Sequence, residues 1–177
     1  MRLVIAATGP INYLIQIGQI DLLPRMFERV ALPSAVHAEL ANSRAPLPVR
    51  HWITSPPAWL EIHDTTGLPQ VLGLDEGETA AIALAEALHA DLLPMEWMSG
   101  MPSRSQGKES RVTGTLGLLD HAAELGLVDF AQAIKKLEQT SFRRREAILD
   151  VCSRNTLGKA AMPEPPLIGT HRSASPR

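Results

Sequence analysis

The sequence predicts an α/β fold in which helices cover both faces of a central parallel sheet, a three-layer α/β/α arrangement. Short apolar runs alternate with helical patterns along the chain, and the segments that join them are short. The first apolar run, residues 3–6, passes through a Thr-Gly-Pro turn directly into a helical pattern. Buried parallel strands are continuous apolar runs, and helices connect them. These patterns alone do not separate the fold from a flavodoxin-like one.

The first part of the chain is expected to supply two strands and three helices. A glycine, Gly18, separates two short helical patterns, and Ser34 is suited to be the N-cap of the third helix, which carries Glu39. In chain order, the expected elements are a strand at 3–6, helices at 11–17 and 21–27, a strand at 30–32 and a helix from Ser34. Residues 42–58 are rich in Pro, Ser and Arg, which predicts a surface loop with Trp52 and Trp59 anchoring its ends.

The second part continues the alternation and then loses it. In chain order, we expect a strand at 59–63, a helix at 79–88, a strand at 91–93, a strand-turn-helix at 111–125, and helices at 129–137 and 146–151. Residues 95–110 are polar and Met-rich and follow neither period. The Pro, Ser, Arg and Gly content of residues 151–177 predicts a disordered tail. We therefore expect one domain at 1–150, with an aberrant segment at 95–110.

Composition narrows the function classes. The formal net charge is −2, so any nucleic-acid site must be local. A single cysteine, Cys152, excludes an internal disulfide framework and suits a reducing cytosol. The sequence has no apolar run long enough to cross a membrane and no signal peptide, so a cytoplasmic location and no membrane partner are expected. No zinc-ligand spacing, G-x-S-x-G, Walker A or G-x-G-x-x-G pattern is present.

Three motifs resemble those of one family. The opening Val-Ile-Ala-Ala-Thr-Gly-Pro is similar to V-I-x-D-T-x-P, and Val-His-Ala-Glu-Leu around Glu39 is similar to V-x-x-E-L. The third motif, Leu-Asp-Glu-Gly-Glu-Thr-Ala-Ala-Ile-Ala-Leu-Ala, contains Glu78. Together they resemble the PIN domain family, in its toxin-related bacterial branch, over residues 1–150. The resemblance implies a PIN-like fold and a ribonuclease in which clustered carboxylates hold Mg²⁺ or Mn²⁺.

The resemblance also implies the site residues. Glu39 and Glu78 are expected to bind the metal and act in catalysis. Ala7 occupies the position of a first-strand acid that the family uses as a ligand. Glu96 is expected to bind the metal in place of a further acid, which the family has in L-L-x-x-D-E-R where this chain has Leu-Leu-Pro-Met-Glu-Trp. Thr8 is expected to hold a metal-bound water, or alternatively to cap the next helix.

Glu39 and Glu78 each have an alternative role that involves no metal. Glu39 can be a solvated helix residue. Asp75 and Glu78 have the spacing of a capping box, in which Asp75 is the N-cap and Glu78 bonds back to its backbone. One rotamer of Glu78 cannot fill both roles, although Asp75 can cap the helix while Glu78 turns to a metal.

Candidate RNA contacts lie further along the chain. The turn at residues 114–117 places backbone N–H groups at a helix start, where Thr115 would meet a phosphate or cap the helix. Lys135, Lys136 and Arg143 belong to the densest basic cluster, which is either an RNA-phosphate contact or a solvated face.

The sequence thus predicts a toxin-related ribonuclease, impaired by Ala7, with RNA as substrate. A small antitoxin and a homodimer are partners implied by analogy. The alternative is a non-catalytic PIN-like domain that binds nucleic acid or protein, or the product of a decayed gene. One choice of codons for residues 97–105 has a shifted frame that begins Asp-Glu-Arg, and a tandem repeat at residues 95–97 would cause the shift. A frame slip is therefore a hypothesis for residues 96–110 and for the tail.

Overall fold

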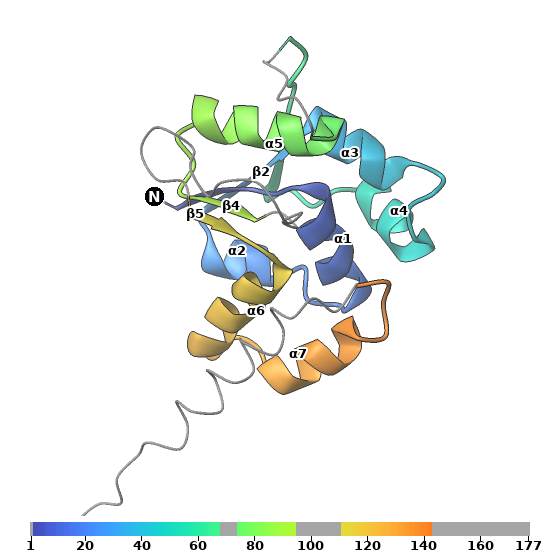
Figure 1. The fold of residues 1–177 in the computed structure, drawn as a ribbon, viewed down its shortest axis with the longest axis vertical. Helices are drawn as coiled ribbons and strands as arrows, with labels where there is room; N and C mark the ends of the chain where they lie inside the picture. Colours follow the sequence, from blue (N-terminus) through green and yellow to red (C-terminus); the bar gives the residue numbers. More distant parts are fainter. Residues whose placement is uncertain (1, 68–73, 95–110, 143–177) are drawn as a thin grey trace, which may run out of the picture. The chain divides into compact units, whose positions relative to one another are not determined.

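Parallel strands form the centre of the computed structural model, which describes residues 2–67, 74–94 and 111–142. Within those residues the sheet has five strands in the spatial order β3-β2-β1-β4-β5 (Figure 1). Neighbouring strands all pair in parallel. The strands are β1 (Leu3–Ile5), β2 (Arg29–Pro33), β3 (Leu60–His63), β4 (Leu92–Pro94) and β5 (Arg111–Thr113).

Helices cover both faces of this sheet. In Figure 1, α3 and α5 lie above the strands, and α2, α6 and α7 lie below them. The predicted three-layer α/β/α fold with a central parallel sheet is therefore confirmed. The helices are α1 (Thr8–Gln16), α2 (Leu22–Met26), α3 (Ser34–Ala41), α4 (Leu47–Thr54), α5 (Glu76–Ala87), α6 (Thr115–Glu124) and α7 (Phe130–Leu137).

The central strand β1 is buried on both faces, and its side chains alternate between two cores. Leu3, Ile5 and Ala7 pack in the cluster that includes the buried face of α5. Val4 and Ala6 pack in the larger cluster with residues of α1, α2, α6 and α7. This alternation follows from the period of two along a strand. It explains why residues 3–7 are apolar without interruption.

The strand order reverses at β1, and this reversal positions the candidate site. The chain runs outward from β1 through β2 to β3, and then returns to β4 and β5 on the other side of β1. In open α/β sheets, ligands bind at such a point, outside the carboxyl ends of the strands. Here the backbone N–H of Ala7 donates to the carbonyl of Pro94 at 3.2 Å, which fixes the end of β1 beside the end of β4.

The segment predicted as a surface loop contains helix α4, so that prediction is wrong for residues 47–54. Two prolines, Pro46 and Pro48, lie at the start of this helix, where a missing N–H is tolerated. Val49 and Ile53 are buried one turn apart against the core. Trp52 and Trp59, which were expected to anchor the two ends of that loop, lie with their ring centroids 6.0 Å apart.

Three N-caps lie one residue before the residue suggested as a cap, and the first helix begins at Thr8, three residues before the start expected at residue 11. The N-caps are Ala7, Pro33 and Gly114, so Thr8, Ser34 and Thr115 are the first residues inside their helices. Each N-cap has the extended backbone that this position requires, but its side chain accepts no hydrogen bond from the first turn of the helix. The Ser34 hydroxyl instead accepts from the backbone N–H of Thr65 at 3.2 Å.

Several predictions fall outside the described residues: Glu96, Arg143, the segment 95–110, the helix at 146–151 and the tail from 151. The described residues belong to one compact unit, Met1–Arg144. None of the helices in the described part of the chain is both long and apolar enough to span a bilayer.

Candidate active site

Glu39 is the centre of the candidate site because three separate elements meet at its carboxylate. It lies on α3 and is half-buried. The hydroxyl of Thr8, in the first turn of α1, donates to Oε2 of Glu39. The backbone N–H of Gly77, in the first turn of α5, donates to Oε1 at 2.9 Å. The carboxylate thus joins α1, α3 and α5 at the carboxyl edge of the sheet.

Gly77 is the residue that allows this approach. A Cβ at position 77 would lie 2.5 Å from both carboxylate oxygens of Glu39, so the glutamate side chain would have to shift and its hydrogen bonds would be disturbed. Glycine therefore lets the backbone of α5 donate directly to Glu39. The contact with Glu39 explains why a glycine lies between Glu76 and Glu78, which the helical pattern alone does not explain.

Ala7 lies beside this contact and contributes no polar group. It follows β1 directly, is the N-cap of α1, and its backbone is extended at φ −89° and ψ 170°. Its side chain is 2% exposed and packs in the core cluster under α5. Thr8, the next residue, bonds to Glu39. Position 7 is therefore next in sequence to a residue that bonds to Glu39, and its methyl group packs against α5.

Glu78 takes the capping role in this structure. The side chain of Asp75 accepts from the backbone N–H of Glu78 at 2.7 Å, as an N-cap does. Burial raises the pKa of Glu78 above its ordinary value, and the negative charges of Asp75 and Glu39 raise it further, while a hydrogen bond from the Asp75 backbone lowers it. The capping box predicted from the sequence is thus present. Glu78 directly follows Gly77, whose backbone N–H donates to Glu39, so both glutamates lie at the start of α5.

The described residues do not by themselves fit the predicted Mg²⁺ or Mn²⁺ site. No group of three or more His, Cys, Asp or Glu suited to a metal occurs within the described ranges. Both oxygens of Glu39 are hydrogen-bonded, the carboxylate of Glu78 bonds to a helix cap, and Ala7 has no ligand atom. Two carboxylates are present, but the third position at the strand end is apolar.

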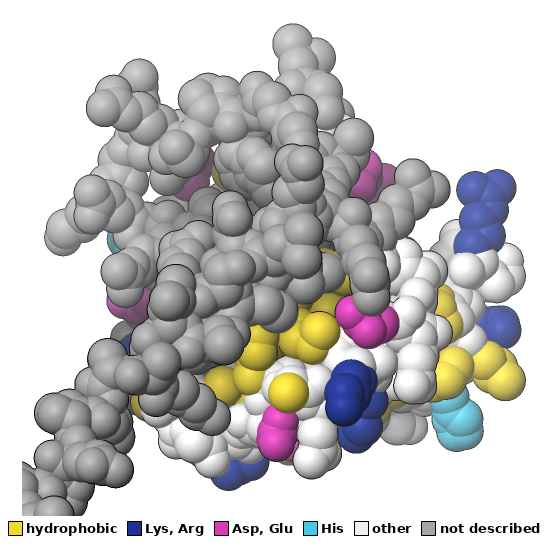
Figure 2. Space-filling view, turned by 60° about the horizontal axis from the view of Figure 1, so that its bottom comes forward, with side chains coloured by type: hydrophobic (Ala, Val, Ile, Leu, Met, Phe, Trp, Pro, Cys, Tyr) yellow, Lys and Arg dark blue, Asp and Glu magenta, His cyan; other side chains and the backbone are white. Residues whose placement is uncertain are grey.

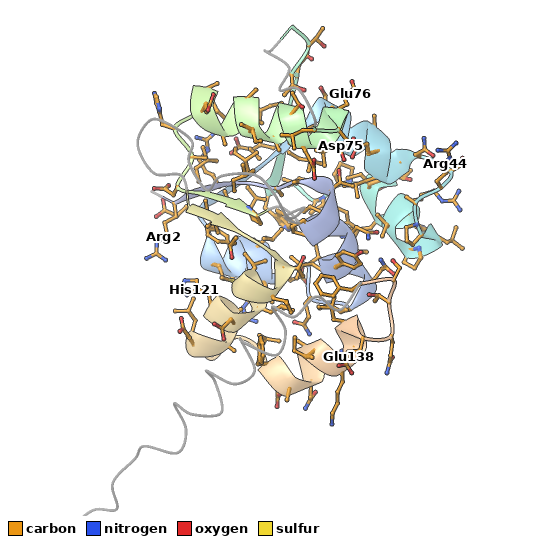
Figure 3. The ribbon with its side chains drawn as sticks, viewed as in Figure 1. Arg2, Arg44, Asp75, Glu76, His121 and Glu138 are labelled. Atoms are coloured by element: carbon orange, nitrogen blue, oxygen red, sulfur yellow. The ribbon has the colours of Figure 1, made fainter. Side chains whose placement is uncertain are left out.

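An open groove of ≈ 310 Å³ extends from the Glu39 carboxylate. It runs from α1 to the connection between α3 and α4, and Figure 3 shows Arg44 at the outer edge of this connection. The residues that line it are Thr8, Asn12, Glu39, Leu40, Asn42, Arg44, Ala45 and Pro46. Sequence reasoning missed Asn12, Asn42 and Arg44. The one available signal was Asn12, a polar residue within the apolar pattern of the first helix.

The other predicted contacts lie elsewhere. The side chain of Thr115 is fully buried at the start of α6. Lys135 and Lys136 are exposed in the last turn of α7, a helix that packs on α6. On the face shown in Figure 2, basic side chains are scattered among apolar and acidic ones across the described surface.

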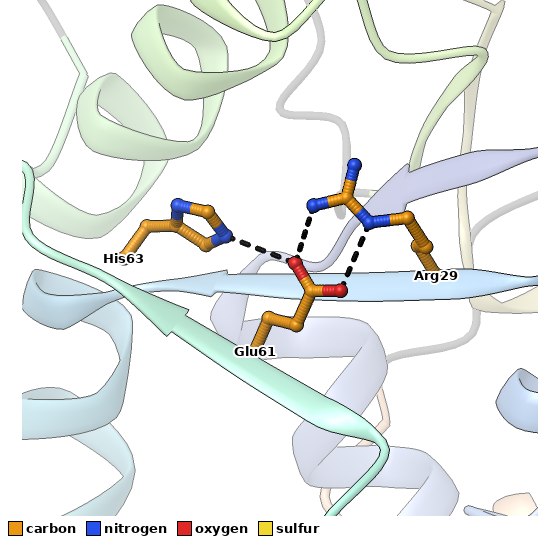
Figure 4. A network of polar contacts seen from close by, with 3 residues as sticks. All are labelled: Arg29, Glu61 and His63. Atoms are coloured by element: carbon orange, nitrogen blue, oxygen red, sulfur yellow. Dashed lines mark hydrogen bonds and ion pairs between the residues drawn. The ribbon is translucent and has the colours of Figure 1, made fainter.

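A separate polar network joins β2 to the edge strand β3 (Figure 4). Arg29 Nε donates to Glu61 at 2.9 Å, a second guanidinium nitrogen donates to the other oxygen, and His63 lies 3.3 Å from Glu61. The hydrogen bond from Arg29 is the main reason that the pKa of Glu61 falls to about 2. We assign this network to strand pairing, because its three residues lie on adjacent strands.

A family model described as PIN domain matches residues 3–156. No curated protein and no solved structure gives a match.

Proposed function

The chain belongs to the PIN domain family, and from this premise we propose that it is a toxin-related ribonuclease whose activity is impaired by the loss of an acid at position 7. PIN domains are nucleases that in general depend on divalent metals. RNA as the substrate and the impaired activity of this chain are our proposal.

The observation that carries the proposal is the convergence on Glu39. Residues of α1, α3 and α5 meet at one carboxylate, at the edge of the sheet where α/β enzymes bind ligands. Glu78 is close enough for the charge of Glu39 to raise its pKa. This is the place where the family motifs put their acids, and the apolar residue there is Ala7.

The arrangement also supports the proposal that an impaired protein keeps its fold. In PIN domains a bound divalent cation supplies a nucleophilic water and stabilises charge on the phosphodiester. Without a full set of ligands, Glu39 is held by Thr8 and Gly77 instead, and Glu78 stabilises the start of α5. These acids contribute to packing between helices, so the protein can keep its structure while it binds metal weakly.

We propose RNA, a small antitoxin protein and a second copy of the chain as partners, by analogy with the toxin-related branch, together with a cytoplasmic location. A catalytically inactive domain that still binds nucleic acid is the second candidate. It is favoured by the methyl group of Ala7 at a position where the family uses a ligand.

The proposal is tested by cleavage of an end-labelled single-stranded RNA with Mn²⁺ or with EDTA. The proteins are the chain as given, Ala7→Asp, and the double variant Ala7→Asp with Glu39→Gln. We expect background cleavage from the chain as given, higher Mn²⁺-dependent cleavage from Ala7→Asp, and a return to background in the double variant. Equal metal-dependent cleavage by the chain as given and Ala7→Asp would refute the impairment. Background cleavage by all three proteins would favour the inactive binding domain.

A further inference from the structure

We propose that the groove beside Glu39 binds one nucleotide of a single-stranded RNA, with its base against the apolar wall and its phosphate on Arg44. This inference rests on the proposed function, because it assigns a substrate contact to the same site. It adds residues that none of the family motifs contain.

The groove is continuous with the candidate site. Thr8 and Glu39, which bond to each other, are part of its lining. A ligand in the groove would therefore have one end at the carboxylate edge of the sheet. Its volume of ≈ 310 Å³ is at the lower end of the range for small-ligand sites, about 300–1,000 Å³, and suits a single nucleotide better than a folded partner.

Asn12 supplies a polar group that the helix itself does not need. It lies one turn after Thr8 on α1, so the two side chains share a face of that helix. Its neighbours Ile11 and Leu14 are buried in the core, whereas Asn12 is half-buried and lines the groove. An amide at this place can donate to and accept from the edge of a base.

The connection between α3 and α4 supplies a cation held by a local turn. The side chain of Asn42 accepts from the backbone N–H of Arg44 at 3.0 Å, and the backbone N–H of Ala45 donates to the carbonyl of Asn42 at 3.0 Å. The side chain of Arg44 is exposed, and in the part of the chain that the structure describes no carboxylate pairs with it. A guanidinium without a protein partner is suited to a phosphate.

The remaining wall is apolar. Leu40, Ala45 and Pro46 line the groove next to these polar groups. An apolar surface, amides that can hydrogen-bond and one cation match the base, the base edges and the phosphate of a nucleotide.

The test is binding of a fluorescein-labelled single-stranded RNA to the full chain in EDTA, followed by anisotropy at several salt concentrations. Arg44→Ala is compared with Arg25→Ala, which removes the same charge from an exposed position on α2. We expect Arg44→Ala to weaken binding about tenfold. It should also reduce the slope of log K against log salt by about 0.7, the value for one phosphate contact on a single strand.

Asn12→Leu separates the two kinds of contact. It removes a neutral group and fills the groove, so it should weaken binding without changing the salt slope. Equal effects of Arg44→Ala and Arg25→Ala, or no RNA binding by the chain as given, would overturn the groove assignment. Circular dichroism of each variant shows whether it is folded.

The outcome is separable from that of the proposed function, because EDTA removes any dependence on metal or cleavage. Weaker binding of Arg44→Ala with no cleavage by Ala7→Asp would support the groove and refute the catalytic proposal. Cleavage by Ala7→Asp that is unaffected by an added Arg44→Ala would support the catalytic proposal and refute the groove.

Discussion

The substitution Ala7→Asp tests the missing ligand most informatively when it is paired with Ala7→Asn. Position 7 is the N-cap of α1, and Asp and Asn are equally good caps that should each stabilise the helix by about 1 kcal/mol over Ala. The two side chains also have nearly the same size, so any overpacking is shared. The difference between the variants therefore isolates the negative charge.

The magnitude follows from the burial of position 7. Ala7 is 2% exposed, and Glu39 and Glu78 add negative charge nearby. Without metal, an unpaired carboxylate there should make Ala7→Asp less stable than Ala7→Asn by about 1–3 kcal/mol. A metal relieves that cost. Loss of a residue that hydrogen-bonds to a metal ligand typically costs about 10–100-fold in metal affinity, so restoring a direct ligand should gain at least as much.

The assay combines Mn²⁺ titration by calorimetry with urea unfolding in the presence and absence of Mn²⁺. At a Mn²⁺ concentration of about 100 times the Kd, binding should raise the free energy of unfolding of Ala7→Asp by about 2.7 kcal/mol. Ala7→Asn and the chain as given should change little. The same Mn²⁺ affinity and the same stabilisation in both variants would show that position 7 is not part of a metal site, and our reasoning would fail.

Three further predictions concern the contacts around the site and the sheet edge, each measured by urea unfolding. Gly77→Ala should lower the free energy of unfolding by about 1–3 kcal/mol, because its Cβ would lie 2.5 Å from the carboxylate oxygens of Glu39; an unchanged stability would mean that Glu39 moves freely. Asp75→Ala should cost about 1 kcal/mol through loss of the α5 cap, and no loss would show that Glu78 alone holds the helix start. Glu61 has a folded pKa of about 2 against an ordinary value of 4.5, so its contribution is full above pH 4.5 and is lost as the pH falls toward 2. Glu61→Gln should therefore cost no more than about 1 kcal/mol at neutral pH, since Arg29 and Glu61 are 35% and 37% exposed. That difference should shrink between pH 4.5 and pH 2, and a constant difference would contradict the ion pair.

The sheet was predictable because buried parallel strands need apolar residues on both faces. Residues 3–6 and 30–32 are such runs, and they correspond to β1 and β2. Helix α4 was missed because its prolines and its polar neighbours resemble a loop. Its only positive sign is the spacing of Val49 and Ile53, two residues too few to define a period.

The helix starts were harder to predict than the helices. A hydroxyl residue next to a turn suggests an N-cap, but Pro33 and Gly114 already have the required extended backbone. Ser34 and Thr115 are then displaced by one position into the first turn. Asp75 was predicted correctly because its partner Glu78, three residues later, completes a capping box.

The site was predictable only in part. The motifs brought Glu39 and Glu78 to attention, but the sequence could not decide between capping and metal binding for Glu78. The groove was beyond prediction, because it joins Asn12 of α1 to Arg44 in a connection more than thirty residues later. Only the packing of α1, α3 and α4 brings those side chains to one place.

The most direct test of the central claim is the position of a bound metal in the Ala7→Asp variant, determined by anomalous diffraction from crystals grown with Mn²⁺. The claim is that position 7, Glu39 and Glu78 form one metal site, which lacks a ligand at position 7 in this chain. It predicts a manganese peak at about 2.1 Å from carboxylate oxygens of position 7 and Glu39, with Glu78 turned from its cap toward the metal. A structure with manganese bound elsewhere, or with no manganese and Glu39 still held by Thr8 and Gly77, would contradict the claim.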